Sequence, residues 1–207
     1  MPAEFNNCDV WGLISDVHAN LPALERALAT LHAAGAQRLA FLGDYLGRGD
    51  SDGCVRRIRS VADVAIVGNR DLDWQDRVSP ATRGWVLSLP RWAQHGRLLL
   101  AHGDARLTPA LSTQQSGRDF RRTWCELEAR QAQVLAFGHS HHARLWRKLA
   151  LEAPAELLGE PVVPLDPQAR YILNVGTTGL PFPGKGPPSV ALVDFCQGQV
   201  RQLAIGT

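Results

Sequence analysis

The sequence lacks a long apolar run and a leader-like beginning. None of its apolar stretches approaches the ~18 consecutive residues that a membrane-spanning helix requires. Residues 1–9 contain no basic segment followed by an apolar one, which is the pattern of a secretory signal peptide. We therefore expect a protein without a membrane span that is not secreted through such a segment.

Charge of one sign and paired cysteines are also missing. The 22 Lys and Arg residues nearly balance the 20 Asp and Glu residues, for a net charge of +2 with neutral histidines. This balance argues against a polybasic arm for nucleic acid. The cysteines Cys8, Cys54, Cys125 and Cys196 form no C-x-x-C pair, which excludes a zinc knuckle and a thioredoxin-type motif. We expect four reduced thiols and a cytoplasmic location.

Size and composition indicate a folded protein. The chain has 207 residues, of which 45% are hydrophobic and 20% charged, and these fractions exclude a disordered or fibrous chain. This length predicts one domain over residues 1–207.

Apolar runs alternate with helical patterns through the first two thirds of the chain, which predicts an α/β fold. The runs are short and continuous rather than alternating, as in strands that are covered on both faces. The predicted strands are 10–14, 39–42, 64–67, 98–101 and 134–137. The predicted helices are 21–34, 53–61, 80–89 and 117–131.

The last third of the chain has a different pattern. Strand-like runs at 171–175, 190–195 and 200–205 follow one another without a helix, and Gln197-Gly198 between the last two suits a hairpin turn. We expect a strand-rich C-terminal extension over about residues 170–205 that completes a sheet or adds a second one. The proline-rich stretch 153–167 is predicted to be a surface loop.

Metal-binding residue types follow five of the predicted strands. Successive sites lie 25 to 37 residues apart, which is about one strand–helix unit. Ligands of open α/β sheets bind beyond the carboxyl ends of the strands, so we expect these side chains to converge. They are Asp16, His18, Asp44, Asn69, His102, His139 and His141.

Seven ligands are too many for one ion and suit two, and the two carboxylate oxygens of Asp44 can bridge them. Mixed histidine, aspartate and asparagine ligands favour Mn, Fe or Zn over Ca or Mg. Two such ions can hold a hydroxide and clamp a phosphoryl group for in-line attack. The pattern therefore predicts hydrolysis of a phosphate ester or anhydride.

The segments around these residues resemble the signature blocks of the calcineurin-like metallophosphoesterases. The resemblance extends over about residues 10–205, and Asn174 to Pro181 is similar to a segment of the compact bacterial and archaeal phosphodiesterase branch. In order, the blocks are Asp16-Val17-His18, Gly43-Asp44-Tyr45-Leu46-Gly47-Arg48-Gly49, Gly68-Asn69-Arg70-Asp71, His102-Gly103 and Gly138-His139-Ser140-His141.

This resemblance implies a four-layer αββα sandwich, in which two mixed β-sheets are flanked by helices, and two divalent metal ions. Mn²⁺ is the expected metal, with Fe, Zn, Ni or Mg as alternatives, and a bridging hydroxide would be the nucleophile. One ion would be held by Asp16, His18, Asp44 and His141. The other would be held by Asp44, Asn69, His102 and His139.

Arg70 stands where the family has a histidine that is proposed to protonate the leaving group. Arginine cannot act as a general acid, because its pKa stays above about 12, but it can bind phosphate oxygens. We therefore count Arg70 among the catalytic and substrate-binding residues and expect a preference for good leaving groups. Arg48 and Tyr45 are further candidates for substrate binding. The alternatives are that Arg48 pairs with a nearby aspartate and that Tyr45 is a packed aromatic residue.

The prediction is thus a metal-dependent phosphohydrolase that acts on a small phosphorylated substrate. We expect neither a membrane nor nucleic acid as a partner, and exposed tryptophans would favour a homodimer. Two other functions stay open. One is a non-catalytic scaffold with this fold, and the other is a dinucleoside polyphosphate hydrolase.

Overall fold

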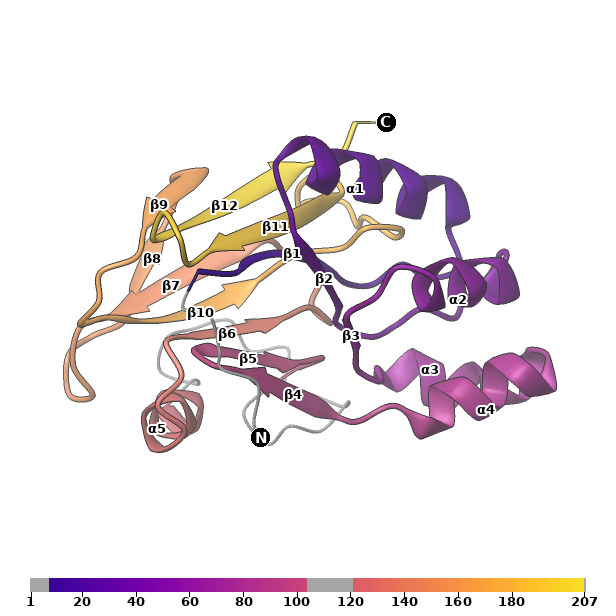
Figure 1. Cartoon of the computed structure of the whole chain (residues 1–207), viewed down its shortest axis with the longest axis horizontal. Helices are drawn as coiled ribbons and strands as arrows, with labels where there is room; N and C mark the ends of the chain where they lie inside the picture. Colours follow the sequence, from indigo (N-terminus) through magenta and orange to yellow (C-terminus); the bar gives the residue numbers. More distant parts are fainter. Residues whose placement is uncertain (1–7, 104–120, 207) are drawn as a thin grey trace.

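The computed structural model describes residues 8–103 and 121–206, in which two six-stranded sheets are stacked face to face (Figure 1). Both sheets are mixed: β1 is parallel to β2 and antiparallel to β11, and β10 is parallel to β6 and antiparallel to β7. The first sheet has the spatial order β3 (Val64–Ala65), β2 (Arg38–Phe41), β1 (Val10–Ile14), β11 (Ser189–Asp194), β12 (Gln199–Ala204) and β9 (Val162–Pro164). The second has the order β4 (Trp92–His95), β5 (Leu98–Ala101), β6 (Val134–Phe137), β10 (Arg170–Asn174), β7 (Arg144–Lys148) and β8 (Glu156–Leu158).

Three of the helices begin where the sequence supplies a capping side chain, and at the start of α2 Asp50 accepts the N–H of Gly53 at 2.7 Å. Asn20 accepts the N–H of Ala23 at 3.1 Å at the start of α1, and Ser79 accepts the N–H of Thr82 at 3.3 Å at the start of α4. No helix of residues 8–103 and 121–206 is both long and apolar enough to cross a membrane. The helices are α1 (Leu21–Ala33), α2 (Ser51–Arg59), α3 (Asn69–Trp74), α4 (Pro80–Ser88) and α5 (Arg121–Ala129), with a 3₁₀ turn η1 (Gln75–Arg77). The predicted helix 117–131 ends two residues earlier than expected, at Ala129, and its residues 117–120 lie outside the described chain.

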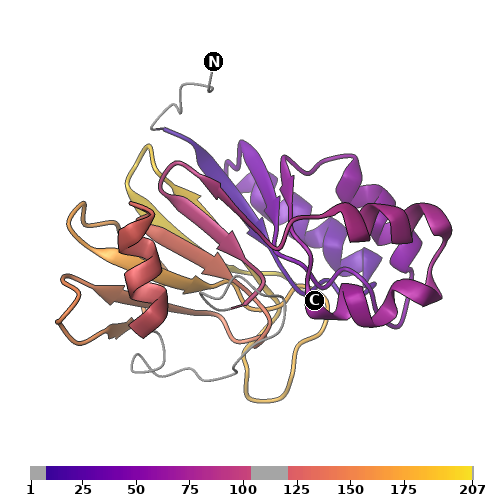
Figure 2. The same ribbon diagram turned by 90° about the horizontal axis from the view of Figure 1, so that it is seen from below.

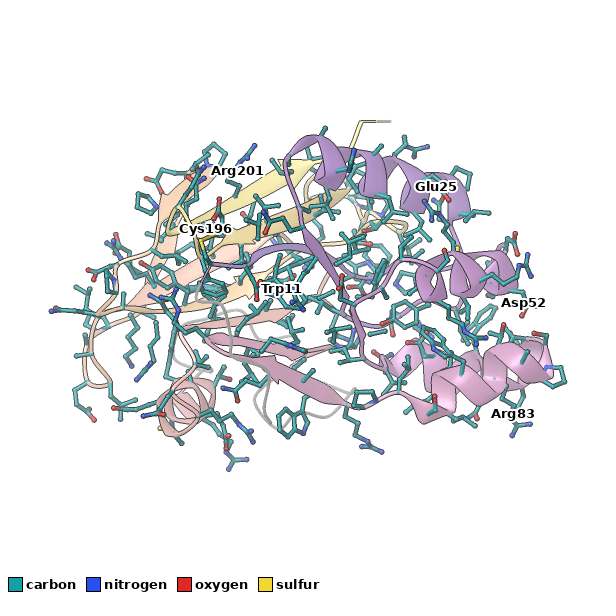
Figure 3. All side chains as sticks on the ribbon, viewed as in Figure 1. Trp11, Glu25, Asp52, Arg83, Cys196 and Arg201 are labelled. Carbon is teal, nitrogen blue, oxygen red and sulfur yellow. A yellow bond between two sulfur atoms is a disulfide. The ribbon has the colours of Figure 1, made fainter. Side chains whose placement is uncertain are left out.

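Three apolar layers hold the sheets and helices together. Trp11 and Leu13 of β1 pack between the two sheets, whereas Ile14 packs against the side of the first sheet that α1 and α2 cover. Trp124 of α5 packs on the outer face of the second sheet. Figure 2 shows α5 and the other helices on opposite sides of the sheets, and Figure 3 shows side chains filling the space between them. The predicted four-layer αββα sandwich is confirmed.

The third predicted strand is shorter than expected. Residues 64–67 are apolar, but β3 contains only Val64 and Ala65. The chain then leaves the sheet, because the N–H of Val67 bonds to the carbonyl of Pro90 at 2.9 Å rather than to β2. This departure directs residues 68–71 toward the carboxyl ends of the strands.

The predicted surface loop 153–167 contains two strands, so that prediction is wrong. β8 pairs with β7 and β9 pairs with β12, each at the edge of its sheet. Pro164 fits in β9 because an edge strand needs backbone donors on only one side.

The C-terminal strands complete both sheets. β10 lies between β6 and β7 in the second sheet, and β11 and β12 form an antiparallel pair in the first. The predicted turn at Gln197-Gly198 joins that pair, and Gly198 has a φ of 63°, in the left-handed region that glycine adopts without strain.

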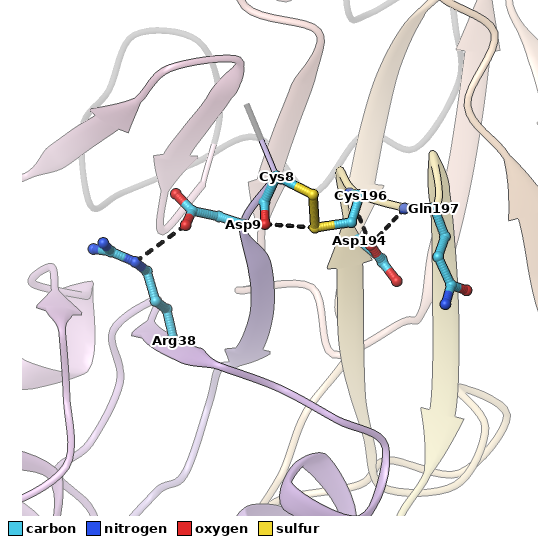
Figure 4. The surroundings of a disulfide bond; sticks show 6 residues. All are labelled: Cys8, Asp9, Arg38, Asp194, Cys196 and Gln197. Atoms are coloured by element: carbon cyan, nitrogen blue, oxygen red, sulfur yellow. Dashed lines mark hydrogen bonds and ion pairs between the residues drawn. A yellow bond between two sulfur atoms is a disulfide. The ribbon is translucent and has the colours of Figure 1, made fainter. Parts of the chain in front are cut away.

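Two of the four cysteines form a disulfide, so the prediction of four reduced thiols is wrong for Cys8 and Cys196 (Figure 4). Val10 lies opposite Asp194 in the β1–β11 pair, which brings the residues just outside these strands together, with a Cα–Cα distance of 4.2 Å. Cys54 is buried and Cys125 is exposed, and both are free thiols. Disulfides are rare in reducing compartments, so the cysteines do not support the predicted cytoplasmic location.

Candidate metal centre

All seven predicted ligands lie at one edge of the sandwich, where strands of both sheets end. Asp16 and His18 follow β1, Asp44 follows β2, and Asn69 begins α3 just after β3. His102 follows β5, and His139 and His141 follow β6. The first sheet therefore supplies the oxygen ligands and one histidine, and the second sheet supplies three histidines.

One group of side chains surrounds Asp16. Ligand atoms of Asp16, His18 and His141 all lie within 4.8 Å of one another. His141 Nε2 is 3.0 Å from Asp16 Oδ1 and 3.1 Å from His18 Nε2. His18 Nε2 is also 3.8 Å from Asp44 Oδ2, which connects this group to the next.

A second group of side chains surrounds His102. The Nε2 atom of His102 lies 3.3 Å from Asp44 Oδ1 and 3.1 Å from Asn69 Oδ1. His139 Nδ1 is 2.9 Å from the same Asn69 oxygen and 3.3 Å from His102 Nε2. Asp44 therefore points one oxygen toward each group, which is the orientation that a bridging ligand would need.

The donor atoms of these groups fit a cation rather than one another. His102 Nδ1 donates to the Leu42 carbonyl at 2.7 Å, and His141 Nδ1 donates to the Leu180 carbonyl at 2.8 Å. Both rings therefore turn the Nε2 lone pair toward the site. These lone pairs face carboxylate and amide oxygens, and within the described part of the chain the buried Asp16 Oδ1 has no hydrogen-bond partner. Acceptors that face acceptors require a positive charge between them, which divalent metal ions would supply.

The pKa values of the histidines reflect this excess of acceptors. Burial opposes the protonation of His102, but the carboxylates of Asp44 and Asp16 outweigh it and raise the pKa of His102 to about 10. Burial also opposes the protonation of His141, and Asp16 raises its pKa. Burial would raise the pKa of Asp16, but His141 and His18 hold it well below its usual value. In the absence of metal, protons thus provide the charge that the site requires.

Most of the predicted ligands have a strained backbone. Seven non-glycine residues of the described chain have a positive φ, and five of them are predicted ligands, with φ between 49° and 62°. Each such residue costs on the order of 1–2 kcal/mol. Strain of this kind concentrates at functional sites. The five residues are Asp16, His18, Asp44, His139 and His141.

Two glycines allow the ligand loops to approach each other. A Cβ on Gly68 would overlap the backbone nitrogen and the carboxylate of Asp44. A Cβ on Gly138 would overlap the carboxylate of Asp16 and the hydroxyl of Ser15. The glycines that precede Asn69 and His139 in the motifs therefore have a steric role.

Sequence reasoning missed the residues that hold the ligands in place. The Asp71 carboxylate accepts four backbone N–H groups, those of Asp44, Tyr45, Leu46 and Gly68, at 2.7–3.1 Å. Its place two positions after Asn69 in the same motif was the available signal. Nothing in the sequence signals Ser15, whose Oγ donates to Asp16 Oδ2 at 2.6 Å. Thr177 lies in the family-like segment Asn174 to Pro181, and its Oγ1 donates to the Asp16 carbonyl at 3.0 Å.

Of the three predicted substrate-binding residues, two lie at the site. Arg48 and Arg70 line a cleft of about 420 Å³ that His18 also borders. Within the described residues Arg48 makes no ion pair, and Arg70 makes a long one with Asp73 at 3.8 Å. The alternative, that Arg48 pairs with a nearby aspartate, is therefore not realised among the described residues.

Tyr45 does not reach the cleft, so its predicted role in substrate binding is wrong. Its side chain is buried, and its hydroxyl lies 2.8 Å from the Phe41 carbonyl and 2.6 Å from the Ile66 carbonyl. The same oxygen accepts the N–H of Gly43 at 3.1 Å. Tyr45 thus fixes the backbone that leads to Asp44, as the packing alternative predicts.

Comparisons with known proteins agree with this geometry. Residues 10–198 match the family model described as the calcineurin-like phosphoesterase superfamily domain. The chain is 30% identical over 143 residues to phosphodiesterase YfcE of Escherichia coli K12, and this match covers 61% of this chain and 66% of that protein. It is 38% identical over 60 residues to the uncharacterized protein MJ0912 of Methanocaldococcus jannaschii, of whose length it spans only 25%.

Solved structures show the same fold. A metallophosphoesterase from Sphaerobacter thermophilus superposes with a TM-score of 0.80 at 23% sequence identity, and the match covers 96% of this chain and 88% of the other. YfcE from E. coli superposes with a TM-score of 0.51 at 23% identity, and the match covers 95% of this chain and 100% of the other.

Proposed function

Because the chain belongs to the calcineurin-like phosphoesterase superfamily, we propose that it is a metal-dependent hydrolase of small phosphodiesters or phosphoanhydrides. The observation that carries this proposal is the convergence of ring nitrogens and of carboxylate and amide oxygens from both sheets on one space, where the buried Asp16 Oδ1 has no hydrogen-bond partner among the described residues. The name of the relative YfcE, a phosphodiesterase, supports the diester over the monoester.

Two divalent ions would occupy this space, one beside Asp16, His18 and His141 and the other beside Asn69, His102 and His139, with Asp44 between them. Mn²⁺ is the proposed metal, since these mixed ligands suit it. Such ions supply an activated water and neutralise charge on the phosphoryl group.

The residues of the chain account for binding and for the leaving-group preference. Arg48 and Arg70 border the cleft, and their guanidinium groups suit the non-bridging phosphate oxygens. In the reaction a water oxygen bonds to phosphorus, the bond from phosphorus to the leaving-group oxygen breaks, and a proton of the water passes to solvent. Arg70 cannot protonate the leaving group, which therefore departs as an anion. Aryl esters and anhydrides, with stable leaving anions, are the proposed substrates.

The test is a hydrolysis assay on protein that has been stripped of metal and then reloaded with Mn²⁺, Zn²⁺, Fe²⁺ or Mg²⁺. Bis(p-nitrophenyl) phosphate and p-nitrophenyl phosphate provide a matched diester and monoester. We expect metal-dependent cleavage that is faster for the diester and is lost in His139→Ala. His32→Ala, which removes an exposed histidine of α1, should retain it.

Cleavage that persists in the His139→Ala protein would contradict the proposed site. Protein that neither binds metal nor cleaves either ester would instead support a non-catalytic scaffold. Cleavage of dinucleoside polyphosphates in preference to both esters would identify the anhydride as the substrate.

A further inference from the structure

The cleft beside the metal-ligand groups has aromatic as well as basic walls. Its two arginines suit the binding of phosphate, but phosphate binding does not account for the aromatic and aliphatic side chains that also line the cleft. Six of the residues that line it are His18, Arg48, Arg70, Trp74, Leu180 and Phe182.

Phe182 lies directly on a predicted metal ligand. Its ring is stacked on that of His141, with a centroid distance of 4.8 Å and an interplanar angle of 22°. Phe182 is nevertheless 47% exposed, and its neighbour in the cleft, Leu180, is 40% exposed. Since His141 covers one face of the ring, the exposed area is mainly the other face, which a planar group can stack on.

The backbone before Phe182 is firmly held. Asn20 Nδ2 donates to the Gly179 carbonyl at 3.0 Å, and the N–H of Leu180 donates to Thr177 Oγ1 at 3.1 Å. The Leu180 carbonyl accepts His141 Nδ1. The ring is therefore pre-organised beside the site, which lowers the entropic cost of stacking a ligand on it.

Trp74 provides a second aromatic wall. It lies at the end of α3, four residues after Arg70, so the two side chains lie on the same face of the helix. Trp74 is partly buried against the core beneath α1 and α2, and the Arg77 guanidinium lies 4.5 Å from its ring centroid. Arg70, which can bind phosphate, and the fixed aromatic surface of Trp74 thus lie next to each other.

We propose that Phe182, together with Trp74, binds a planar aromatic substituent of the phosphate, so that the preferred substrates are nucleotide-like or aryl phosphates rather than aliphatic ones. This inference rests on the proposed function, because the phosphate has to lie at the metal centre. Stacking is tolerant of the identity of the ring, so the cleft selects the class of substituent rather than one base.

The test measures binding, which does not require turnover. The probes are the methylenephosphonate analogues of AMP and of ribose 5-phosphate, whose P–C bond cannot be hydrolysed and which differ only in the base. Calorimetry with the Mn²⁺-loaded protein should show that the AMP analogue binds about 5- to 150-fold more tightly, the effect of one base–aromatic stack.

Variants then identify the ring responsible. Phe182→Ala should remove most of this preference, so that the two analogues bind with similar affinities, whereas Phe182→Tyr should preserve it. Leu149→Ala is the matched control: it removes a side chain that is 58% exposed and lies just after β7, outside this cleft, and should preserve the preference.

The outcomes separate the two proposals. Equal affinities for the two analogues in the wild type, or a full preference in Phe182→Ala, would overturn the stacking inference and leave the proposed function intact. If the metal-loaded protein binds neither analogue and also does not cleave the aryl diester, the proposed function is overturned and this inference with it.

Discussion

The carboxylate of Asp71 accepts the backbone N–H of Asp44 at 2.9 Å, which ties the first turn of α3 to the loop that carries the central predicted ligand. The same carboxylate accepts the N–H groups of Gly68, Tyr45 and Leu46. The position of Asp44 therefore depends on a buried side chain that itself lies outside the ligand groups.

Replacing Asp71 should weaken both the fold and the metal site. In Asp71→Asn an amide nitrogen takes the place of one oxygen and faces two N–H groups. We expect the free energy of unfolding of the metal-free protein to fall by about 1–3 kcal/mol. We also expect metal affinity to fall by about 10- to 100-fold.

Denaturant unfolding and a Mn²⁺ titration check this prediction. Burial and the neighbouring Asp44 raise the pKa of Asp71 to about 7, so the comparison belongs near pH 9, where the carboxylate is ionised. Asp73→Asn, at a side chain of α3 that is 58% exposed, is the control and should change neither quantity. Wild-type stability and metal affinity in Asp71→Asn would contradict the positioning role.

Arg70 should set the leaving-group preference. Arg70→His restores a group that can donate a proton, and general acid catalysis is worth typically ~10²–10⁴-fold. Turnover of alkyl phosphodiesters, whose leaving groups need protonation, should therefore rise more than turnover of aryl diesters. The measurement is kcat for a matched alkyl and aryl series, and an equal increase for both would count against this account.

Tyr45 should act on stability rather than on substrate binding. Tyr45→Phe removes a hydroxyl that lies among the backbone groups of Phe41, Gly43 and Ile66. We expect the free energy of unfolding to fall by about 1–3 kcal/mol and KM for an aryl diester to stay within about twofold. An increase in KM without loss of stability would return Tyr45 to the substrate site.

The pKa of His102 predicts how metal and pH act together. Burial disfavours its charged form, but Asp44 and Asp16 raise its pKa to about 10 from 6.5 in the metal-free protein. A histidine whose pKa is raised by folding contributes its full stabilisation at a pH below its pKa in the unfolded chain. This contribution is lost as the pH rises toward its pKa in the folded protein. A bound cation replaces the proton.

The stabilisation that Mn²⁺ confers on the fold should therefore grow as the pH rises from about 6.5 to about 8.5 at constant free metal. The measurement is the difference in unfolding free energy between the loaded and the metal-free protein at several pH values, together with the protons released on binding. A difference that shrinks over this range would show that His102 does not exchange a proton for metal.

Local patterns predicted the strands that carry the site. The apolar runs Val10–Ile14, Leu98–Ala101 and Val134–Phe137 form β1, β5 and β6 with the predicted bounds, because each is covered on both faces. Five of the seven predicted ligands follow these three strands, so strand ends and motifs together predicted that they lie at one edge of the sandwich. Tyr45 was misplaced because its neighbour Asp44 faces the ligand groups, whereas the Tyr45 ring lies in the core, 5.8 Å from that of Trp85.

Other features depend on contacts that no local pattern encodes. β8 and β9 lie in a proline-rich stretch, and only their edge positions make them compatible with it. The disulfide joins residues 188 positions apart that meet only because β1 pairs with β11. Phe182 follows a motif-like segment, but its stacking on His141 depends on how that segment crosses the site.

The most direct measurement of the central claim is the metal content of the protein. After removal of all metal and titration with Mn²⁺, native mass spectrometry or elemental analysis should find two ions per chain. Asp44→Ala, which removes the carboxylate that points toward both ligand groups, should lower this number. Less than one ion per wild-type chain at saturating Mn²⁺, and again with Zn²⁺ or Fe²⁺, would contradict the assignment of these seven side chains to a metal centre.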